Sequence, residues 1–201
     1  MSSRRPIRIL RRAPFLLGLV MAALSVCCQG GDGDDDTSPL PCTAISFDAA
    51  NTSPVAGDVY FSPSSSTCTT VDVSVRVNEI SDVFTVGFDL MYPASVLLYQ
   101  SYTLGPLLQK GTATAPRALL TSGSGALQVV MTRLSPDGPV VAGANEILIT
   151  LRFSKVGVGA GMIDFNSSSS STVTEEILDD SGQTRPASFG PGHGGTVTVV
   201  P

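Results

Sequence analysis

The clearest pattern along this chain is a strict alternation of apolar and polar positions. In residues 70–78 every second residue is a valine, and the residues between the valines are polar or charged. Successive side chains of a strand point to opposite faces, so a period of two predicts a strand with one buried and one solvated face. The predicted buried residues are Val71, Val73, Val75 and Val77.

A second alternating stretch, residues 84–92, carries larger apolar side chains and predicts a central strand. Pro93 follows it and has no N–H to donate to a ladder, so we expect a corner there and a new strand over residues 96–104. The predicted inward residues are Phe84, Val86, Phe88, Leu90 and Tyr92, and the outward residues are Thr85, Gly87, Asp89 and Met91.

The rest of the chain reads as short strands separated by turns. Loops rich in Gly, Pro and Ser are expected over residues 62–67, 105–116, 122–125, 135–143, 179–186 and 190–195. Further strands are expected over residues 59–61, 118–121, 127–134, 146–154, 162–165, 172–178 and 196–200. Turn signals at this spacing predict an all-β protein, most economically a single antiparallel β-sandwich.

Charge is unevenly distributed along the chain. The formal net charge is −5, but five of the twelve basic residues lie within the first twelve positions. The remainder has seven basic and 17 acidic residues, a net charge of −10. An acidic body without a basic patch argues against nucleic-acid binding.

The N-terminus has the pattern of an export signal. An arginine-rich start precedes an apolar run over residues 13–26, which is shorter than the roughly 20 residues of a membrane-spanning helix. The sequence Leu-Ser-Val-Cys ending at Cys27 resembles a bacterial lipoprotein box, which implies lipidation of Cys27. Val26 replaces the usual small residue, and the adjacent Cys28 is an alternative acceptor. Retention as a membrane anchor and ordinary cleavage with release are the competing interpretations.

These features divide the chain into a signal (1–27), a linker (28–41) and a folded domain (42–201). The linker consists mainly of Gly, Asp and Pro, and such a segment cannot bury a core. We interpret its four aspartates as a solvated spacer rather than a calcium site, because nothing fixes their geometry. The protein is expected to be exported, either to the cell envelope and surface as a lipoprotein or into the medium.

Two cysteines, Cys42 and Cys68, lie outside the signal. Because an exported chain meets oxidising conditions, we predict that they form a disulfide. Two cysteines, a single histidine and no CxxC motif supply no metal-ligand set, so neither a metal nor another cofactor is predicted.

Several segments, taken in order, resemble the signature of cohesin domains. Residues 78–97 resemble the corner, aromatic-rich strand and Tyr-Pro turn of that family, although Pro93 comes one place early. Residues 125–134, 143–153 and 178–182 resemble its later strands and acidic turn, and residues 194–199 resemble its closing strand. The resemblance implies a jelly-roll sandwich of about nine strands, related to carbohydrate-binding modules.

Cohesins bind dockerin modules, so the resemblance also implies a protein partner and a role in assembling polysaccharide-degrading enzymes. It places recognition on the outward side of residues 84–92 and the neighbouring strand. Thr85 and Gly87 are smaller than the residues typical of dockerin binders, and interface energy concentrates in a few large side chains. The implied face is Thr85, Gly87, Asp89, Met91, Gln128, Val130 and Thr132.

Catalysis is not expected. His193 is the only histidine and lies in a glycine-rich segment, where we expect it to be solvated, and no GxSxG or HExxH motif is present. A carbohydrate-binding module is the main alternative function, and it would need exposed aromatic rings, for which Tyr60, Tyr99 and Tyr102 are candidates. A purely structural envelope domain, with no ligand on its solvated sheet face, is the third possibility.

Overall fold

The computed structural model describes residues 45–166, 173–190 and 192–201, all within the second of two units of the chain, Pro39–Pro201. The strands are β1 (Ile45–Ala49), β2 (Val59–Ser66), β3 (Thr70–Val77), β4 (Thr85–Met91), β5 (Leu97–Leu104), β6 (Arg117–Gly123), β7 (Ala126–Thr132), β8 (Glu146–Lys155), β9 (Gly159–Phe165), β10 (Glu176–Leu178), β11 (Thr184–Arg185) and β12 (Gly195–Val199). A single 3-10 turn, η1 (Leu107–Gln109), follows β5.

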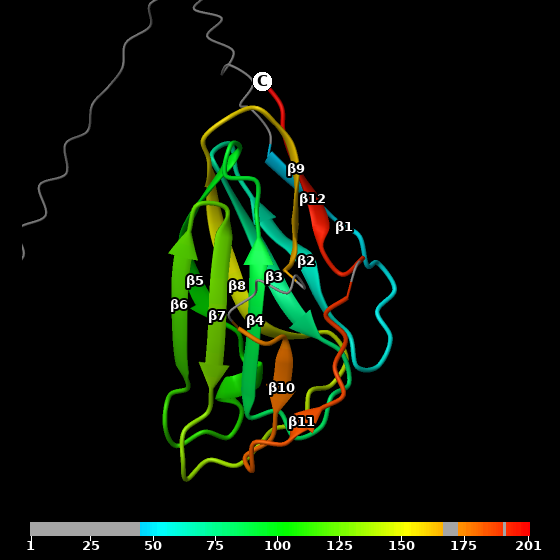
Figure 1. Ribbon diagram of the computed structural model, residues 1–201, viewed down its shortest axis with the longest axis vertical. Helices are drawn as coiled ribbons and strands as arrows, with labels where there is room; N and C mark the ends of the chain where they lie inside the picture. The colour runs from blue at the N-terminus through cyan, green and yellow to red at the C-terminus, as the bar shows by residue number, and fades with distance from the viewer. Residues whose placement is uncertain (1–44, 167–172, 191) are drawn as a thin grey trace, which may run out of the picture. The chain divides into compact units, whose positions relative to one another are not determined.

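The strands form two antiparallel sheets (Figure 1). The smaller sheet has the order β2-β3-β8-β5, and the larger has eight strands organised around β4. Along one edge of β4, β9 pairs with its end at Leu90 and Met91 and β10 pairs with residues 85–87. Along the other edge lie β7 and then β6. The predicted antiparallel β-sandwich is therefore confirmed.

The alternating stretches supply the core between the sheets. The four valines of β3 and Val86, Phe88 and Leu90 of β4 are buried, as their period of two predicts. Phe88 packs edge-on against Phe165 of β9, with ring centroids 5.5 Å apart. Such aromatic contacts tie β4 and β9 into one apolar layer.

Two predicted loops are wrong in part. Residues 62–67 were expected to form a loop, but β2 continues to Ser66. Proline is tolerated there because β2 is an edge strand, and its register with β3 shifts between Pro63 and Ser65. Residues 105–116 contribute to the core through Leu107 and Leu108, which are fully buried in η1. β1 was not predicted as a strand and pairs with β12 along its full length.

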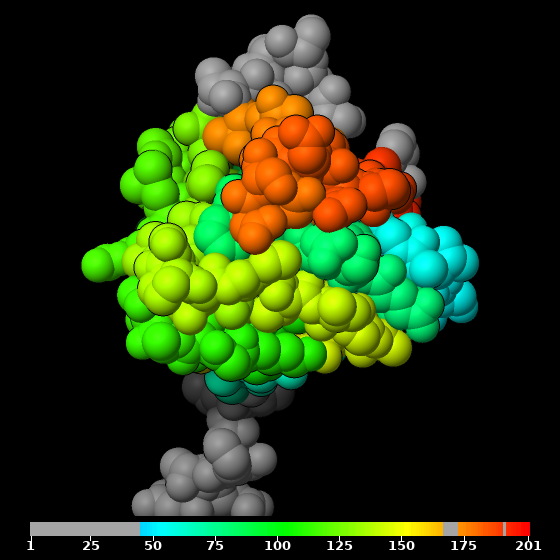
Figure 2. All heavy atoms as spheres, turned by 90° about the horizontal axis from the view of Figure 1, so that it is seen from below, coloured from blue at the N-terminus to red at the C-terminus, as the bar shows by residue number. Residues whose placement is uncertain are grey.

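The 133–145 loop and the segment of β10 and β11 lie at the lower end of the sandwich (Figure 2). The 133–145 loop contacts the segment before β4 through a β-bridge between Val140 and Val83. β10 contacts the same segment, because the N–H of Phe84 donates to the carbonyl of Leu178. The buried guanidinium of Arg133 donates to the carbonyls of Leu108, Lys110 and Gly138, which joins the 133–145 loop to the segment that contains η1.

Several predictions concern residues outside the described part. The signal, Cys27, Cys28, the acidic linker and Cys42 all lie there, so the predicted lipidation and boundaries at 27/28 and 41/42 stay predictions. Cys68, in the turn between β2 and β3, is disulfide-bonded, but its pairing with Cys42 also stays a prediction. Within the described residues, no helix has the length and apolar character needed to cross a bilayer.

Candidate functional site

The predicted face lies on two neighbouring strands of the larger sheet. β4 and β7 pair without a register shift, which sets Thr85 opposite Thr132, Gly87 opposite Val130 and Asp89 opposite Gln128. β6 continues the face beyond β7, and β9 continues it beyond the end of β4. We call this solvent side the outer face; its members include Thr85, Gly87, Asp89, Met91, Arg117, Leu119, Thr121, Gln128, Val130, Thr132, Met162 and Asp164.

Two of the predicted contact residues are covered by the chain itself. A Cβ atom added to Gly87 would lie 3.1 Å from the carbonyl oxygen of Thr174 and 3.3 Å from Cγ1 of Val173. The segment that leads into β10 therefore passes over Gly87. Asp89 is only 5% exposed. Neither residue offers a surface to a partner, so we leave both out of the contact set.

Three carboxyl groups lie near this covered region. Burial raises the pKa of Glu175 above its usual range, and the charges of Asp164 and Asp89 raise it further. Oε1 of Glu175 is buried and has no hydrogen-bond partner among the described residues. Among the described residues, no group of three His, Cys, Asp or Glu side chains is arranged to hold a metal ion.

The outer face exposes large apolar side chains at both of its sides. Met91 is 52% exposed, and Met162 of β9 is 60% exposed. Asp164 of β9 pairs with Met91, and Met162 lies two positions before Asp164 on the same face. On the other side Leu119 is 70% exposed and lies opposite the half-buried Val130. Polar groups lie beside these apolar side chains. The hydroxyls of Thr85 and Thr132 are 2.7 Å apart, and Gln128 of β7 lies on the same face.

The outward side of the smaller sheet differs in chemistry. Arg152 donates two hydrogen bonds of 2.7 Å to Asp72, and these contacts hold the pKa of the Asp72 carboxyl below its usual range. The hydroxyls of Ser74 and Thr150 are 2.8 Å apart, and Gln100 donates to Ser154. Polar groups in the middle of this sheet thus satisfy one another, although Leu98 at its β5 edge is 50% exposed.

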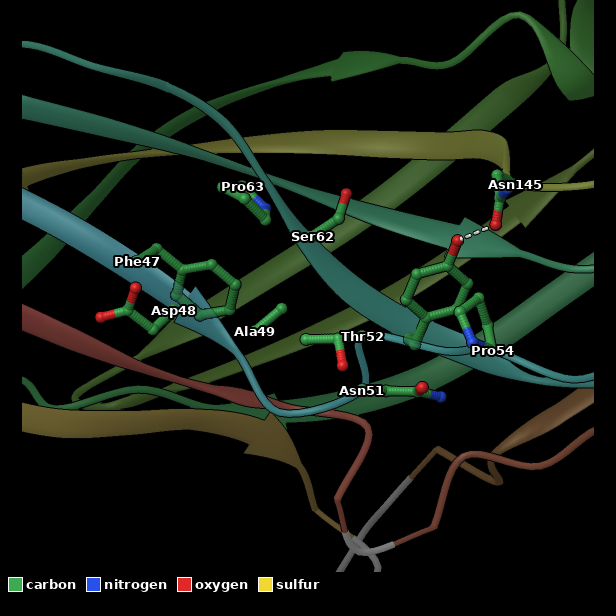
Figure 3. Close-up of a pocket in the computed structure, with 10 residues that line it drawn as sticks. Phe47, Asp48, Ala49, Asn51, Thr52, Pro54, Ser62, Pro63 and Asn145 are labelled. Carbon is green, nitrogen blue, oxygen red and sulfur yellow. Dashed lines mark hydrogen bonds between the residues drawn. The ribbon is translucent and has the colours of Figure 1, made fainter.

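A crevice of about 500 Å³ opens between β1 and β2 (Figure 3). Several of its polar groups bind within the chain: the hydroxyl of Tyr60 donates to Oδ1 of Asn145 over 2.5 Å, and Ser62 accepts from Nε of Arg76. Asn51, on its rim, donates to Asp58. These contacts are internal to the chain, and Asp48 and Thr52 line the crevice beside them.

His193 is better ordered than the sequence predicts. Its Nδ1 lies 2.9 Å from the carbonyl oxygen of Ser188, and its Nε2 lies 3.7 Å from Asp58. Its side chain is only 14% exposed, so the expectation of a solvated histidine is wrong. Since Asp58 also accepts the N–H of Val55, His193 helps join the β1–β2 loop to the segment before β12.

Exposed aromatic rings are scarce. Tyr60 is 4% exposed, Tyr99 is half-buried, and Tyr102, at 40%, is the one exposed aromatic residue in the described part of the chain. A flat platform for sugar rings, which the carbohydrate-binding alternative requires, is therefore not found among these residues.

Comparison with known proteins identifies the fold. No family model and no curated protein sequence matches the chain. Among solved structures, the type II cohesin dyad from the adaptor ScaA scaffoldin of Acetivibrio cellulolyticus is 13% identical with a TM-score of 0.53, over 66% of this chain. The described sandwich has the cohesin fold. The match spans 45% of the length of that dyad.

Two other cohesins are similar at lower scores. A type II cohesin domain from the cellulosome of Acetivibrio cellulolyticus is 14% identical with a TM-score of 0.49, over 75% of this chain and 91% of its own. A non-cellulosomal cohesin from the archaeon Archaeoglobus fulgidus is 16% identical with a TM-score of 0.46, over 73% of this chain and 84% of its own. At these identities the likeness concerns the cohesin fold alone.

Proposed function

We propose that this chain is a non-catalytic, cohesin-like module that binds a protein partner of dockerin type through its outer face. The observation that carries this proposal is the exposure of Met91, Met162 and Leu119 on one side of the larger sheet. Large apolar side chains gathered on one face of a soluble domain are typical of an interaction surface. The cohesin fold agrees with this use of the sheet.

The chemistry of the outer face favours a protein over a sugar. Methionine is flexible and polarisable, and it is enriched in protein interfaces. Asp164 adds negative charge beside Met91, and no described arginine or lysine forms an ion pair with it. We therefore expect a partner that offers apolar side chains, with lysine or arginine at the β9 side.

The cellular setting belongs to the same proposal. The arginine-rich, apolar N-terminus and the box at Cys27 support export, with attachment to the cell surface by a lipid or release into the medium. A dockerin-type partner at the surface would connect the module to polysaccharide degradation, as the sequence resemblance implies. A structural envelope domain would share the export signal but would bind no such partner.

The test uses residues 39–201, which contain all the described strands and their core. Dockerin-bearing proteins encoded by the source organism are titrated against the wild type, Met91→Arg and the control Ser101→Arg. Met91 lies on the outer face, and Ser101 is an exposed residue of β5 in the other sheet. An arginine at Gly87 would be unsuitable, because Val173 and Thr174 cover that position.

We expect the wild type and Ser101→Arg to bind equally and Met91→Arg to bind at least about tenfold more weakly, since a few large side chains dominate interface energy. Equal binding by all three proteins would contradict the use of this face. Binding to insoluble polysaccharide, with no dockerin bound, would favour the carbohydrate alternative instead.

A further inference from the structure

The two sheets end in strands that have one unpaired edge. Within the described residues, β1, β6 and β11 end the larger sheet, and β2 and β5 end the smaller one. An unpaired edge presents N–H and C=O groups in a row, and another strand can bind them. Proteins usually block such edges with prolines, bulges, charges or short strands.

Four of these five edges carry such a device. β2 contains Pro63 and a register shift beside it, and β5 has a register shift between Tyr99 and Ser101. β11 has only two residues. β1 is five residues long, includes the exposed Asp48, and faces β2 across the crevice. These features disfavour regular pairing with a further strand.

β6 has none of these devices. Its seven residues pair with β7 from Arg117 to Gly123 without a register shift, and it contains no proline. Its only charged residue is Arg117 at its first position. In Figure 1 it lies at the margin of the larger sheet, with no strand beyond it. Leu119 in its middle is the most exposed large apolar residue of the described chain.

We propose that two copies of this chain pair antiparallel through their β6 strands, about an axis at Leu120. The strand is self-complementary in this register: Leu119 faces Thr121 of the other copy, Ala118 faces Ser122, and Arg117 faces Gly123. No like charges oppose one another, which would be unfavourable. Leu119 of each copy, exposed in the single chain, gains a cross-strand neighbour.

The paired sheets would be continuous across the two copies. The two-fold axis of an antiparallel pair is perpendicular to the sheet, so both outer faces would look to the same side. The dimer would then present two copies of the outer face to one side, which raises avidity for a partner with two modules. The pairing depends only on β6 and stands whether or not the outer face binds a dockerin-type protein.

Sedimentation equilibrium of residues 39–201 tests the pairing. We expect a concentration-dependent dimer for the wild type. Leu119→Lys with Thr121→Lys places lysines opposite one another and is expected to weaken the dimer at least about tenfold. The control, Ser101→Lys with Thr103→Lys, adds the same charge to exposed positions of the β5 edge and should leave the dimer intact.

A third variant tests the register. Leu119→Lys with Thr121→Glu sets opposite charges face to face across the axis and is expected to restore dimerisation. Circular dichroism verifies that each variant is folded, as expected for exposed positions. A monomeric wild type, a dimer unaffected by the two lysines on β6, a dimer lost in the β5 control, or no recovery with glutamate would each overturn the proposal.

Discussion

Gly87 shows how a single position on the outer face depends on a distant part of the chain. Its phase in β4 is outward, as the alternation predicts, yet Val173 and Thr174 cover it. The sequence indicates the phase because the strand period is two. It does not indicate the cover, which comes from a segment more than 80 positions later in the sequence.

Replacing Gly87 with alanine is expected to destabilise the domain by about 1–3 kcal/mol, because the new methyl group would press on the Thr174 carbonyl. Gly123→Ala is the matched control, since a Cβ at that position meets no atom within 4 Å. Urea unfolding of both variants at neutral pH measures the difference. Equal stability of the two variants would show that the segment before β10 does not bear on β4.

At the scale of elements, β3 and β8 show that patterning can predict a strand but not its partner. The four valines of β3 are buried as expected, and their phase places Asp72 outward. The contact of Asp72 with Arg152 appears only when β8 pairs beside β3. The same holds for β1 and the second half of β2, whose weak patterns become strands because a neighbour completes the ladder.

The Asp72–Arg152 contact predicts a pH dependence. The pKa of Asp72 is lowered in the folded state, so this carboxylate stabilises the fold above its unfolded pKa of about 3.9. That contribution is lost as the pH falls through the lower, folded pKa. Asp72→Asn should therefore unfold at lower urea concentration than the wild type at pH 7, and the gap should shrink toward pH 3.

The control for this prediction is Asp48→Asn, which changes an exposed carboxylate on β1. It should follow the wild type over the whole pH range. A gap between Asp72→Asn and the wild type that stays constant from pH 7 to pH 3 would mean that the ionised form of Asp72 adds no stability.

At the scale of the whole molecule, we predict that a disulfide at Cys68 holds the residues before β1 to the sandwich. Cys68 lies in the turn between β2 and β3 and is disulfide-bonded, and we predict Cys42 as its partner. A cross-link over this length of chain would stabilise the fold by roughly 3–4 kcal/mol through the unfolded state. The Cys42→Ser, Cys68→Ser variant should lose about that much in urea unfolding.

Peptide mapping without reduction measures the pairing directly. A fragment joining Cys42 to Cys68 is expected, with both cysteines protected from alkylation until a reductant is added. Alkylation of Cys42 in the unreduced protein would contradict the predicted bridge.

The sequence by itself determined the fold class and the inward and outward phases of the main strands. Alternation over β3, β4 and β8 follows from backbone geometry and needs no partner to be read. Tertiary structure alone decided which outward residues meet solvent. Val173 and Thr174 cover Gly87, whereas Met91, Met162 and Leu119 remain exposed, because long-range pairing of β9 and β10 with β4 brings distant segments together.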